Sequence, residues 1–417
     1  MRVAVIGAGA AGLATLKALL HAGCDAVGYE SGDRPGGLWT DTYASLHLNT
    51  SRARTEFAAF PMPAGWPDYP SAVRVAGYLA DYADRFGLTP HIRFGTTVTR
   101  VEPRWTVTTE DGDTGRFDAV VVANGHNRVP RWPAPAYPGT FDGVQMHAHD
   151  YRTSDVFRDR RVLVVGMGNS AMDIAVDASH VARGPVLLSA RHGVHIVPKY
   201  LFGRPADATG GAIAGLPWRL RQAIAETLLR VAVGTPQRYG LPAPSRGLFR
   251  SHPTVSDTIL HRLTHGEVVA RPGIDRLDGA KVVFTDDTID AVDVIVWATG
   301  YRVHLPFLSS RWTGPDPEAL PLYRRVFHLD DPTLAFVGLM QSTGAAFPVV
   351  EAQGELVAAY LTGSCALPPA TDQRRAVERA LTAAVARWGA SARPHMRVDF
   401  DSYIAELNRE IARGARR

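Results

Sequence analysis

The sequence predicts an α/β fold with two Rossmann-like dinucleotide-binding domains, the first of them discontinuous. One observation is a strand–turn–helix pattern with fixed glycine spacing, found in VAVIGAGAAGL from Val3 and again in VLVVGMGNSAM from Val162. Another is a late segment, VDVIVWATGYRV from Val292, which repeats the pattern of FDAVVVANGHNR from Phe117. We interpret this late segment as the point where the chain returns to its first domain.

The first glycine-rich segment has the spacing of a dinucleotide cradle. Gly7 makes the tight turn, Gly9 lets the backbone approach a pyrophosphate, and Gly12 lets the helix pack closely on the strand. The strand after that helix ends on Glu30, near the spacing of about 20 residues at which an acidic side chain accepts from ribose hydroxyls. Because an acid here repels a 2′-phosphate, this site suits FAD or NAD better than NADP.

The second glycine-rich segment ends differently. It carries Gly166 and Gly168, with Ala171 in the third place, which helix–strand packing usually tolerates. The next strand ends without an acid and offers Ser189 and Arg191 instead. An arginine can pair bidentately with a phosphate, so this site suits NADP. A flavin in the first site and NADPH in the second would imply hydride transfer between them.

Composition excludes several classes of function. The net charge of +4 is spread along the 417 residues without a basic block, which argues against a nucleic-acid partner. Cys24 and Cys365 form no CxxC pair, so a redox-active dithiol is excluded and a reducing cytoplasm fits. No stretch reaches the roughly 18 apolar residues of a membrane helix, and His149, His192 and His195 lack partners at metal-ligand spacing, so we expect neither membrane nor metal.

The predicted domain order places the second nucleotide site inside the first domain's sequence. A proline-rich connection from Arg128 precedes a first boundary near residue 152. We expect residues 1–152 and 297–417 to form the FAD-binding domain, and residues 153–296 to form an NADPH-binding domain with a helical insert, LPWRLRQAIAETLLRVAVG. Between the two nucleotide sites, IRFGTTVTRVEP and WTVTTEDG predict a β-meander.

Several segments resemble the flavin-containing monooxygenases, the class B flavoprotein monooxygenases. The most specific is FDGVQMHAHDY, which fits the family pattern FxGxxxHxxx(Y/F) just ahead of the second glycine-rich segment. RPGGLW, WATGY, VPKYLFGRP and VGLMQ also look like family segments in family order, so the resemblance covers nearly the whole chain. The motif residues are Phe141, Gly143, His147 and Tyr151.

The resemblance implies an NADPH- and O2-dependent enzyme that oxygenates an amine nitrogen or a sulfide sulfur through a C4a-hydroperoxyflavin. It places the Asn49 amide beside the flavin, where a neutral donor supports the peroxide. His147 is expected to act in the linker rather than as an acid or base. Tyr151 stands where the Baeyer–Villiger branch usually has tryptophan, which disfavours ketone insertion. A homodimer is expected at the family level only.

The expected cofactor contacts follow from the two cradles and from these family segments. For FAD they are Gly7, Gly9, Ala10, Ala11, Gly12, Glu30, Gly37, Leu38, Trp39, Val98, Ala123, Gly125 and Gln341. For NADPH they are Gly166, Gly168, Asn169, Ser170, Ala171, Ser189, Arg191, Thr299 and Gly300.

Two other functions stay open. One is oxidative decarboxylation of an indole-pyruvate-like 2-oxo acid, performed by plant relatives that share these motifs. The other is a flavin- and NADP-binding redox sensor or reductase that oxygenates nothing, for which Asn49 and the FxGxxxHxxxY motif would be unnecessary. One sequence does not reveal the shape of the substrate pocket.

Overall fold

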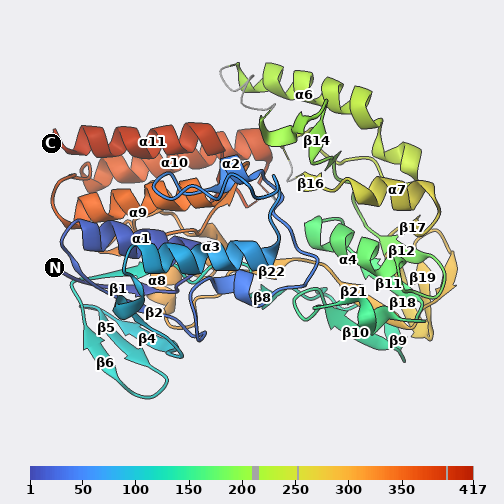
Figure 1. The fold of residues 1–417 in the computed structure, drawn as a ribbon, viewed down its shortest axis with the longest axis horizontal. Helices are drawn as coiled ribbons and strands as arrows, with labels where there is room; N and C mark the ends of the chain where they lie inside the picture. Colours follow the sequence, from blue (N-terminus) through green and yellow to red (C-terminus); the bar gives the residue numbers. More distant parts are fainter. Residues whose placement is uncertain (209–215, 251–252, 391–392, 417) are drawn as a thin grey trace. The chain divides into compact units, whose positions relative to one another are not determined.

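The computed structural model describes residues 1–208, 216–250, 253–390 and 393–416 of the chain (Figure 1). Its contacts divide it into two compact units. Unit 1 consists of Met1–Asp41, Arg52–Val129 and Arg302–Arg417, and unit 2 of Thr42–Ser51 and Pro130–Tyr301. The first long crossing into unit 2 therefore falls between residues 129 and 130, ahead of the predicted boundary at 152. The short segment Thr42–Ser51, which carries Asn49, was not expected in unit 2.

Unit 1 is built on a five-stranded sheet whose strands are all parallel. The strand order is β23-β7-β1-β2-β3. All four residues of β7 and four of the five in β1 are buried, which explains why both sequences are nearly continuous apolar runs. The bounds are β1 (Arg2–Ile6), β2 (Asp25–Tyr29), β3 (Ile92–Arg93), β7 (Ala119–Val122) and β23 (Leu334–Phe336).

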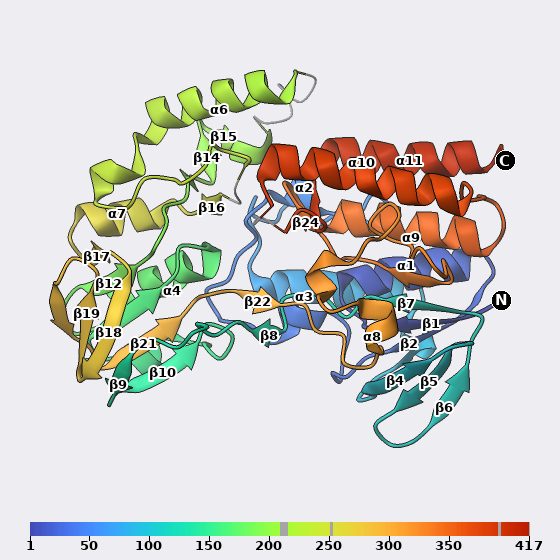
Figure 2. The same cartoon turned by 180° about the vertical axis from the view of Figure 1, so that it is seen from behind.

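Helices cover this sheet in layers, with α9 packed directly on α1 (Figures 1 and 2). The close approach depends on Gly354, where an added Cβ would lie 3.1 Å from the Cα of Thr15 in α1. The described helices of unit 1 come from all three of its chain segments. They are α1 (Ala10–His21), η1 (Gly37–Thr40), α2 (Arg52–Thr55), α3 (Ala72–Arg85), η2 (Thr89–His91), α8 (Ser310–Thr313), η5 (Pro317–Ala319), α9 (Phe347–Leu361), α10 (Ala370–Trp388) and α11 (Phe400–Gly414).

The predicted β-meander is confirmed as a separate antiparallel sheet of unit 1, formed by β4 (Val98–Glu102), β5 (Thr106–Thr109) and β6 (Thr114–Arg116). Two short strands, β24 (Gln341–Ser342) and β25 (Arg397–Val398), pair in parallel near the C-terminal helices. Besides the two passages that flank Thr42–Ser51, the chain passes between the units at β8 (Val129–Pro130) and β22 (Tyr301–Arg302).

Unit 2 has a five-stranded parallel sheet of the same kind. The order is β10-β21-β11-β12-β17, so β11 has the next strand of the chain, β12, on one side and a late strand, β21, on the other. In unit 1, β1 lies between β2 and β7 in the same way. The bounds are β10 (Val144–His147), β11 (Val162–Val165), β12 (Val186–Ser189), β17 (Val268–Arg271) and β21 (Val294–Trp297).

This topology corrects the interpretation of the repeated segment VDVIVWATGYRV. Its strand, β21, pairs with β10 and β11 in the sheet of unit 2, so the chain has not yet returned to the first unit there. The repeat reflects equivalent positions in two similar sheets, because β7 and β21 are each the neighbour of the strand that precedes a glycine-rich turn.

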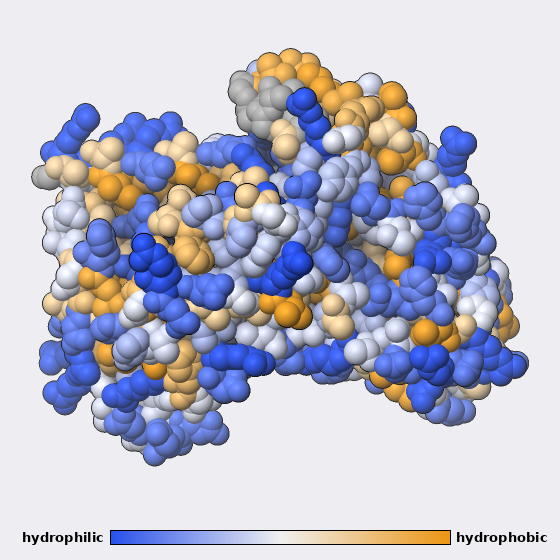
Figure 3. All heavy atoms as spheres, in the orientation of Figure 1, coloured by the Kyte–Doolittle hydropathy of each residue, from blue (hydrophilic) through white to orange (hydrophobic). Residues whose placement is uncertain are grey.

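The predicted helical insert is confirmed as α6 (Trp218–Val233), although Leu229 is its one buried residue. Leu220 and Val231 of this helix are 49% and 74% exposed, and apolar side chains show at the surface over α6 in Figure 3. The remaining elements of unit 2 are β9 (Gly139–Phe141), η3 (Ser154–Phe157), α4 (Asn169–Ser179), β13 (Ile196–Val197), β14 (Tyr200–Leu201), β15 (Arg204–Pro205), η4 (Pro236–Tyr239), β16 (Thr254–Val255), α7 (Thr258–Thr264), β18 (Ile274–Gly279), β19 (Lys281–Phe284) and β20 (Ile289–Ala291).

Candidate functional site: two glycine-rich turns and a tethered loop

The first glycine-rich turn joins β1 to α1 in unit 1, and packing alone requires two of its glycines. Gly7 has φ +105°, and a Cβ there would lie 2.5 Å from the carbonyl oxygen of Ala123. A Cβ on Gly12 would lie 1.8 Å from the carbonyl oxygen of Gly7. These distances are impossible for real side chains, so the turn and the helix can approach each other only with glycine at both positions.

Gly9, the residue before α1, has a different role from its neighbours. The nearest protein atom to a Cβ placed there is the Cα of Gly37, at 3.6 Å, so packing within unit 1 does not demand glycine. The N-terminus of α1, whose first residues are Ala10 and Ala11, begins here without a side-chain cap. A helix N-terminus whose N–H groups have no side-chain cap, and which adjoins a glycine, is suited to binding a pyrophosphate.

Glu30 is held against this turn at the carboxyl end of β2. Its Oε2 accepts a hydrogen bond of 2.7 Å from the backbone N–H of Ala8, and its Oε1 accepts one of 2.8 Å from Gly32. The carboxylate is thus fixed in orientation beside the helix start, and its remaining lone pairs are available to ribose hydroxyls. The residues present therefore fit a nucleotide that carries free ribose hydroxyls.

The other residues expected to contact FAD also lie in unit 1. Gly37, Leu38 and Trp39 form η1, where Leu38 is 52% exposed. The Trp39 ring packs edge-on against Phe347, at 6.4 Å between centroids. Gly125, with φ +75°, follows β7. The backbone N–H of Gln341 donates a hydrogen bond of 2.8 Å to the carbonyl of Met396.

Val98 is the predicted FAD contact that this arrangement supports least. Its side chain is only 6% exposed and packs in the apolar core of unit 1. This packing leaves its backbone as the group that can meet a nucleotide, and the contact stays a prediction.

The second glycine-rich turn joins β11 to α4 in unit 2 and repeats the steric logic of the first. Gly166 has φ +137°, and a Cβ there would lie 2.4 Å from the carbonyl oxygen of Ala298, just as Gly7 faces Ala123. No described protein atom lies within 4 Å of a Cβ placed on Gly168. Ala171 is fully buried against the sheet, so alanine fills the third place without strain.

The start of α4 is fixed by β16. The backbone N–H of Val255 donates to Oδ1 of Asn169 at 2.8 Å, and the hydroxyl of Thr254 donates to the carbonyl of Met167 at 2.5 Å. Asn169 thus uses its side-chain oxygen within the protein, whereas Ser170 lies in the first turn of α4. The N–H groups at the N-terminus of α4 adjoin Gly168, which has no side chain to fill the space beside them. This helix end is therefore suited to binding a second phosphate group.

At the end of β12 the two predicted NADPH residues differ in their surroundings. Ser189 is buried, and its hydroxyl donates to the carbonyl of Pro272 at 2.6 Å. Arg191 is exposed, with its stem over Gly273. Arg191 therefore remains the group free to meet a 2′-phosphate, while a nucleotide contact by Ser189 stays a prediction.

Thr299 and Gly300 follow β21 and are bound to the connection between the units. The Thr299 hydroxyl donates to the carbonyl of Arg131 at 2.5 Å, and the N–H of Arg131 donates to Gly300 at 2.9 Å. These bonds fix the backbone beside Ala298, the residue that faces the second turn. Their contact with NADPH stays a prediction.

The family motif builds the interior of unit 2. A Cβ on Gly143 would lie 2.4 Å from the carbonyl of Asp293 and 2.7 Å from the Phe141 ring. His147 is fully buried beside the rings of Trp132 and Tyr301, and its Nδ1 accepts from the N–H of His149 at 3.0 Å. Burial lowers the pKa of His147, which favours the neutral imidazole. These contacts agree with a structural role for the motif.

Tyr151, the last residue of the motif, belongs to a polar network that sequence reasoning missed. Its hydroxyl donates to Oδ2 of Asp177 at 2.8 Å, and the hydroxyl of Ser45 donates to the same oxygen. One turn earlier on α4, Asp173 accepts at 2.8 Å from the hydroxyl of Tyr43. Two aspartates four residues apart on an otherwise apolar helix, MDIAVDA, were the available signal.

The same network fixes the loop that carries Asn49. Tyr43 and Ser45 bind α4, and the N–H and hydroxyl of Ser51 donate to Oδ2 of Asp207 at 2.6 and 2.9 Å. The segment Thr42–Ser51 is therefore tied to unit 2 at both ends. Asn49 lies half-buried between the ties, and no hydrogen bond to another described residue uses its amide.

Burial is the largest cause of the pKa shifts of Asp173, in this network, and of the nearby Lys199. Burial raises the pKa of Asp173 to about 6, while the Tyr43 hydroxyl and the Lys199 ammonium oppose that shift. Burial also lowers the pKa of Lys199, against the attraction of Asp173 and Asp257. The Asp173 carboxyl is thus poised to change its charge in mildly acidic solution.

Two kinds of feature are missing from the described ranges. They contain no cluster of three or more His, Cys, Asp or Glu side chains that could hold a metal ion. None of the helices in those ranges combines the length and apolar character that a transmembrane span requires.

Comparison with known proteins points to one family. A family model described as flavin-binding monooxygenase-like matches residues 1–415. Flavin-containing monooxygenase 3 of Rattus norvegicus is 31% identical over 438 residues, which cover 97% of this chain and 82% of the relative. Flavin-containing monooxygenase 1 of Oryctolagus cuniculus is 34% identical over 88% of this chain and 75% of its own.

Solved structures agree with the sequence matches. S-allyl-L-cysteine S-oxygenase from Allium sativum has a TM-score of 0.73 and 26% identity, covering 99% of this chain and 88% of its own. An open crystal structure of cyclohexanone monooxygenase has a TM-score of 0.75 over 100% of this chain and 98% of its own, and its 20% identity shows the fold alone. As the motifs predicted, the chain belongs to the flavin-binding monooxygenase-like family, whose members are FAD- and NADPH-dependent monooxygenases.

Proposed function

We propose that this enzyme uses NADPH and O2 to oxygenate a soft nucleophile, an amine nitrogen or a sulfide sulfur, through a C4a-hydroperoxyflavin. In this proposal unit 1 is a discontinuous FAD-binding domain and unit 2 binds NADPH. The acid at Glu30 and the base at Arg191, in equivalent places after the two turns, support this assignment of nucleotides. FAD would supply the oxygen-activating chemistry, and NADPH the hydride.

One observation carries the proposal: the loop that bears Asn49 is tied to α4, the helix that starts at the second glycine-rich turn. A nicotinamide nucleotide bound at that turn and the Asn49 amide are thereby fixed in a single unit. We propose that Asn49 donates a hydrogen bond to the oxygen adduct, and that this unit excludes water from it.

Oxygenation of nitrogen or sulfur needs little acid–base catalysis by protein side chains, because the substrate's lone pair attacks the distal oxygen of the hydroperoxide directly. The buried state of His147 fits this expectation, since its neutral ring is enclosed by aromatic side chains. The 26% identity to the S-allyl-L-cysteine S-oxygenase supports a sulfide as one class of substrate. A cytoplasmic location and a homodimer remain part of the proposal, and light scattering on the purified protein tests the latter.

Product analysis under 18O2 tests the reaction type. The purified enzyme is supplied with NADPH and, in separate reactions, with a tertiary amine, a thioether and an aryl 2-oxo acid. We expect one 18O atom in an N-oxide or a sulfoxide. Carbon dioxide released from the oxo acid, with an acid product one carbon shorter, would favour oxidative decarboxylation instead. NADPH consumed with hydrogen peroxide as the only product from all three would favour the reductase or sensor.

A further inference from the structure

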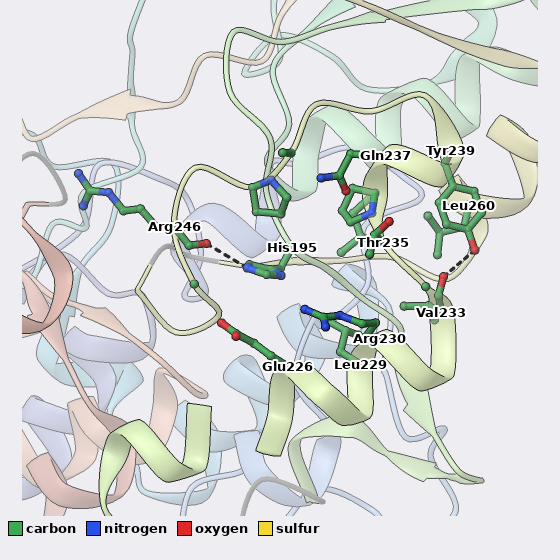
Figure 4. A pocket seen from close by; sticks show the side chains of 16 residues that line it. His195, Glu226, Leu229, Arg230, Val233, Thr235, Gln237, Tyr239, Arg246 and Leu260 are labelled. Atoms are coloured by element: carbon green, nitrogen blue, oxygen red, sulfur yellow. Dashed lines mark hydrogen bonds between the residues drawn. The ribbon is translucent and has the colours of Figure 1, made fainter. Parts of the chain in front are cut away.

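A cavity of about 270 Å³ lies within unit 2 (Figure 4), and none of the residues that line it belongs to the glycine-rich turn of that unit. Its apolar walls include Leu229 and Val233 of α6, Ile196 of β13 and Leu260 of α7. The volume lies slightly below the usual range for ligand pockets, about 300–1,000 Å³, so an occupant would be a small molecule. Neither the family motif nor the two nucleotide sites uses this cavity.

Hydrogen bonds within the insert hold the cavity in shape. The hydroxyl of Tyr239 donates to the carbonyl of Val233 at 2.8 Å, which joins η4 to the end of α6. A ring nitrogen of His195 lies 3.0 Å from the carbonyl oxygen of Arg246, on the opposite wall. The polar groups of Tyr239 and His195 are thus engaged with the protein, and the cavity exists before a ligand arrives.

Among the charged side chains that line the cavity, the guanidinium of Arg230 is the group placed to bind an anion. Glu226 is held at the wall by two neutral donors, because its Oε1 accepts from the N–H of Leu248 at 2.7 Å and from the side-chain amide of Gln222 at 2.9 Å. Arg246 meets the cavity through its backbone carbonyl, and Figure 4 shows its guanidinium directed away from His195. Figure 4 shows the Arg230 guanidinium directed into the space between His195 and Glu226, and the described part of unit 2 gives it no ion-pair partner.

We infer that this cavity binds a small organic carboxylate with an apolar body. The carboxylate would pair with the guanidinium of Arg230, whose planar fork matches it bidentately. The apolar body would lie against Leu229, Val233 and Leu260. A neutral molecule of the same shape would keep the apolar contacts and lose the ion pair.

The wall of the cavity is connected to the second glycine-rich turn through two short strands. The carbonyl of His195 accepts from the N–H of Thr254 at 2.9 Å, which aligns β13 with β16. From β16, Thr254 binds the carbonyl of Met167 and the N–H of Val255 binds Asn169, as described above. A ligand that shifts β13 would therefore shift the turn, and binding at the two sites should be coupled reciprocally. This coupling rests on the proposed NADPH site, whereas the carboxylate site does not.

Calorimetric titration of the FAD-loaded protein, saturated with NADP+, tests the site with benzoate and with its neutral isostere benzamide. We expect saturable binding of one benzoate per chain, with benzamide at least about tenfold weaker. Arg230→Gln should weaken benzoate binding by at least about tenfold, and Val233→Phe, which fills the cavity, should remove it. Arg219→Gln is the matched control, since Arg219 lies on the same helix and does not line the cavity.

Three results would overturn the site: no saturable binding of benzoate, equal binding by the Arg230→Gln and Arg219→Gln variants, or unchanged binding after Val233→Phe. The coupling is tested by titrating NADP+ with and without saturating benzoate. We expect the Kd of NADP+ to change in the native protein and not in the Val233→Phe variant, and an unchanged Kd in both would overturn the coupling. Because these titrations need no turnover, their failure is distinct from failure of the proposed oxygenation.

Discussion

The hydroxyl of Tyr43 donates a hydrogen bond of 2.8 Å to the half-buried carboxylate of Asp173, 130 residues later in the chain. Six residues after Tyr43 comes Asn49, and four residues before Asp173 comes Asn169, the first residue of α4. One bond thus connects the loop proposed to face the flavin with the helix proposed to hold NADPH. The predictions below follow from this connection and from the two turns.

Removing the Tyr43 hydroxyl should loosen the Asn49 loop without unfolding the protein. We expect Tyr43→Phe to lower the free energy of unfolding by about 1–2 kcal/mol, because a half-buried carboxylate loses a partner. The lifetime of the oxygenated flavin should fall by about tenfold, the effect of roughly 1.4 kcal/mol on a barrier, while the Kd of NADP+ stays within about twofold. Urea unfolding and stopped-flow absorbance measure these effects.

The matched control for Tyr43→Phe is Tyr137→Phe, since the Tyr137 ring stacks on Trp297 in the same unit. Equal effects of both substitutions on the lifetime would contradict the role of Tyr43.

The raised pKa of Asp173 should make stability depend on pH. The pKa is about 6 in the folded protein and 3.8 in the reference state, so between these values the folded state binds more protons than the unfolded state. The contribution of Asp173 to the free energy of unfolding should therefore fall as pH rises from about 4 to about 7, by on the order of 3 kcal/mol in total.

Asp173→Asn, which imitates the protonated carboxyl, should remove this part of the pH dependence. The measurement compares urea unfolding of the native protein and the variant from mildly acidic to neutral pH. We expect the difference between their unfolding free energies to change through the pKa of about 6. A difference that stays constant over this pH range would show that ionisation of Asp173 does not destabilise the folded protein.

Two glycine-to-alanine substitutions separate packing from phosphate binding. Gly12→Ala places a Cβ 1.8 Å from the carbonyl of Gly7, so we expect a protein that retains no FAD and unfolds more easily. Gly168→Ala meets no described atom within 4 Å, so the unfolding free energy should change by less than about 1 kcal/mol. If the NADPH pyrophosphate lies over Gly168, the Kd of NADPH should nevertheless rise by at least about tenfold. Unchanged NADPH binding by this variant would contradict the predicted phosphate position.

Arg191 should determine the preference for NADPH over NADH. Arg191→Ala removes the guanidinium expected to pair with the 2′-phosphate, so the KM for NADPH should rise far more than the KM for NADH. Steady-state kinetics with both nucleotides measure the ratio. Arg276→Ala is a control, because Arg276 is an exposed residue of the same unit whose partner is the adjacent Asp275. Equal changes for the two nucleotides would remove the 2′-phosphate assignment.

The sequence predicted those parts of the fold that depend on local pattern. Glycine spacing predicted both turns, because the backbone at Gly7 (φ +105°) and Gly166 (φ +137°) adopts a conformation that favours glycine, which is a local property of the chain. The pairing of Tyr43 with Asp173 could not be predicted, since no local pattern records which of many polar groups meet across 130 residues. The interpretation of the segment from Val292 as the return to the first domain was wrong for a related reason. Two similar sheets give their equivalent strands the same pattern, and only hydrogen bonding shows to which sheet a strand belongs.

Stopped-flow absorbance shows directly whether the enzyme forms an oxygenated flavin and protects it from decay. The protein is reduced anaerobically with NADPH and mixed with oxygenated buffer in the absence of substrate. We predict a long-lived C4a-hydroperoxyflavin band that decays faster when an amine or a thioether is added, and much faster on its own in an Asn49→Ala variant. Direct return to oxidised flavin, with hydrogen peroxide as the only product, would rule out the proposed oxygenation and favour a reductase or sensor.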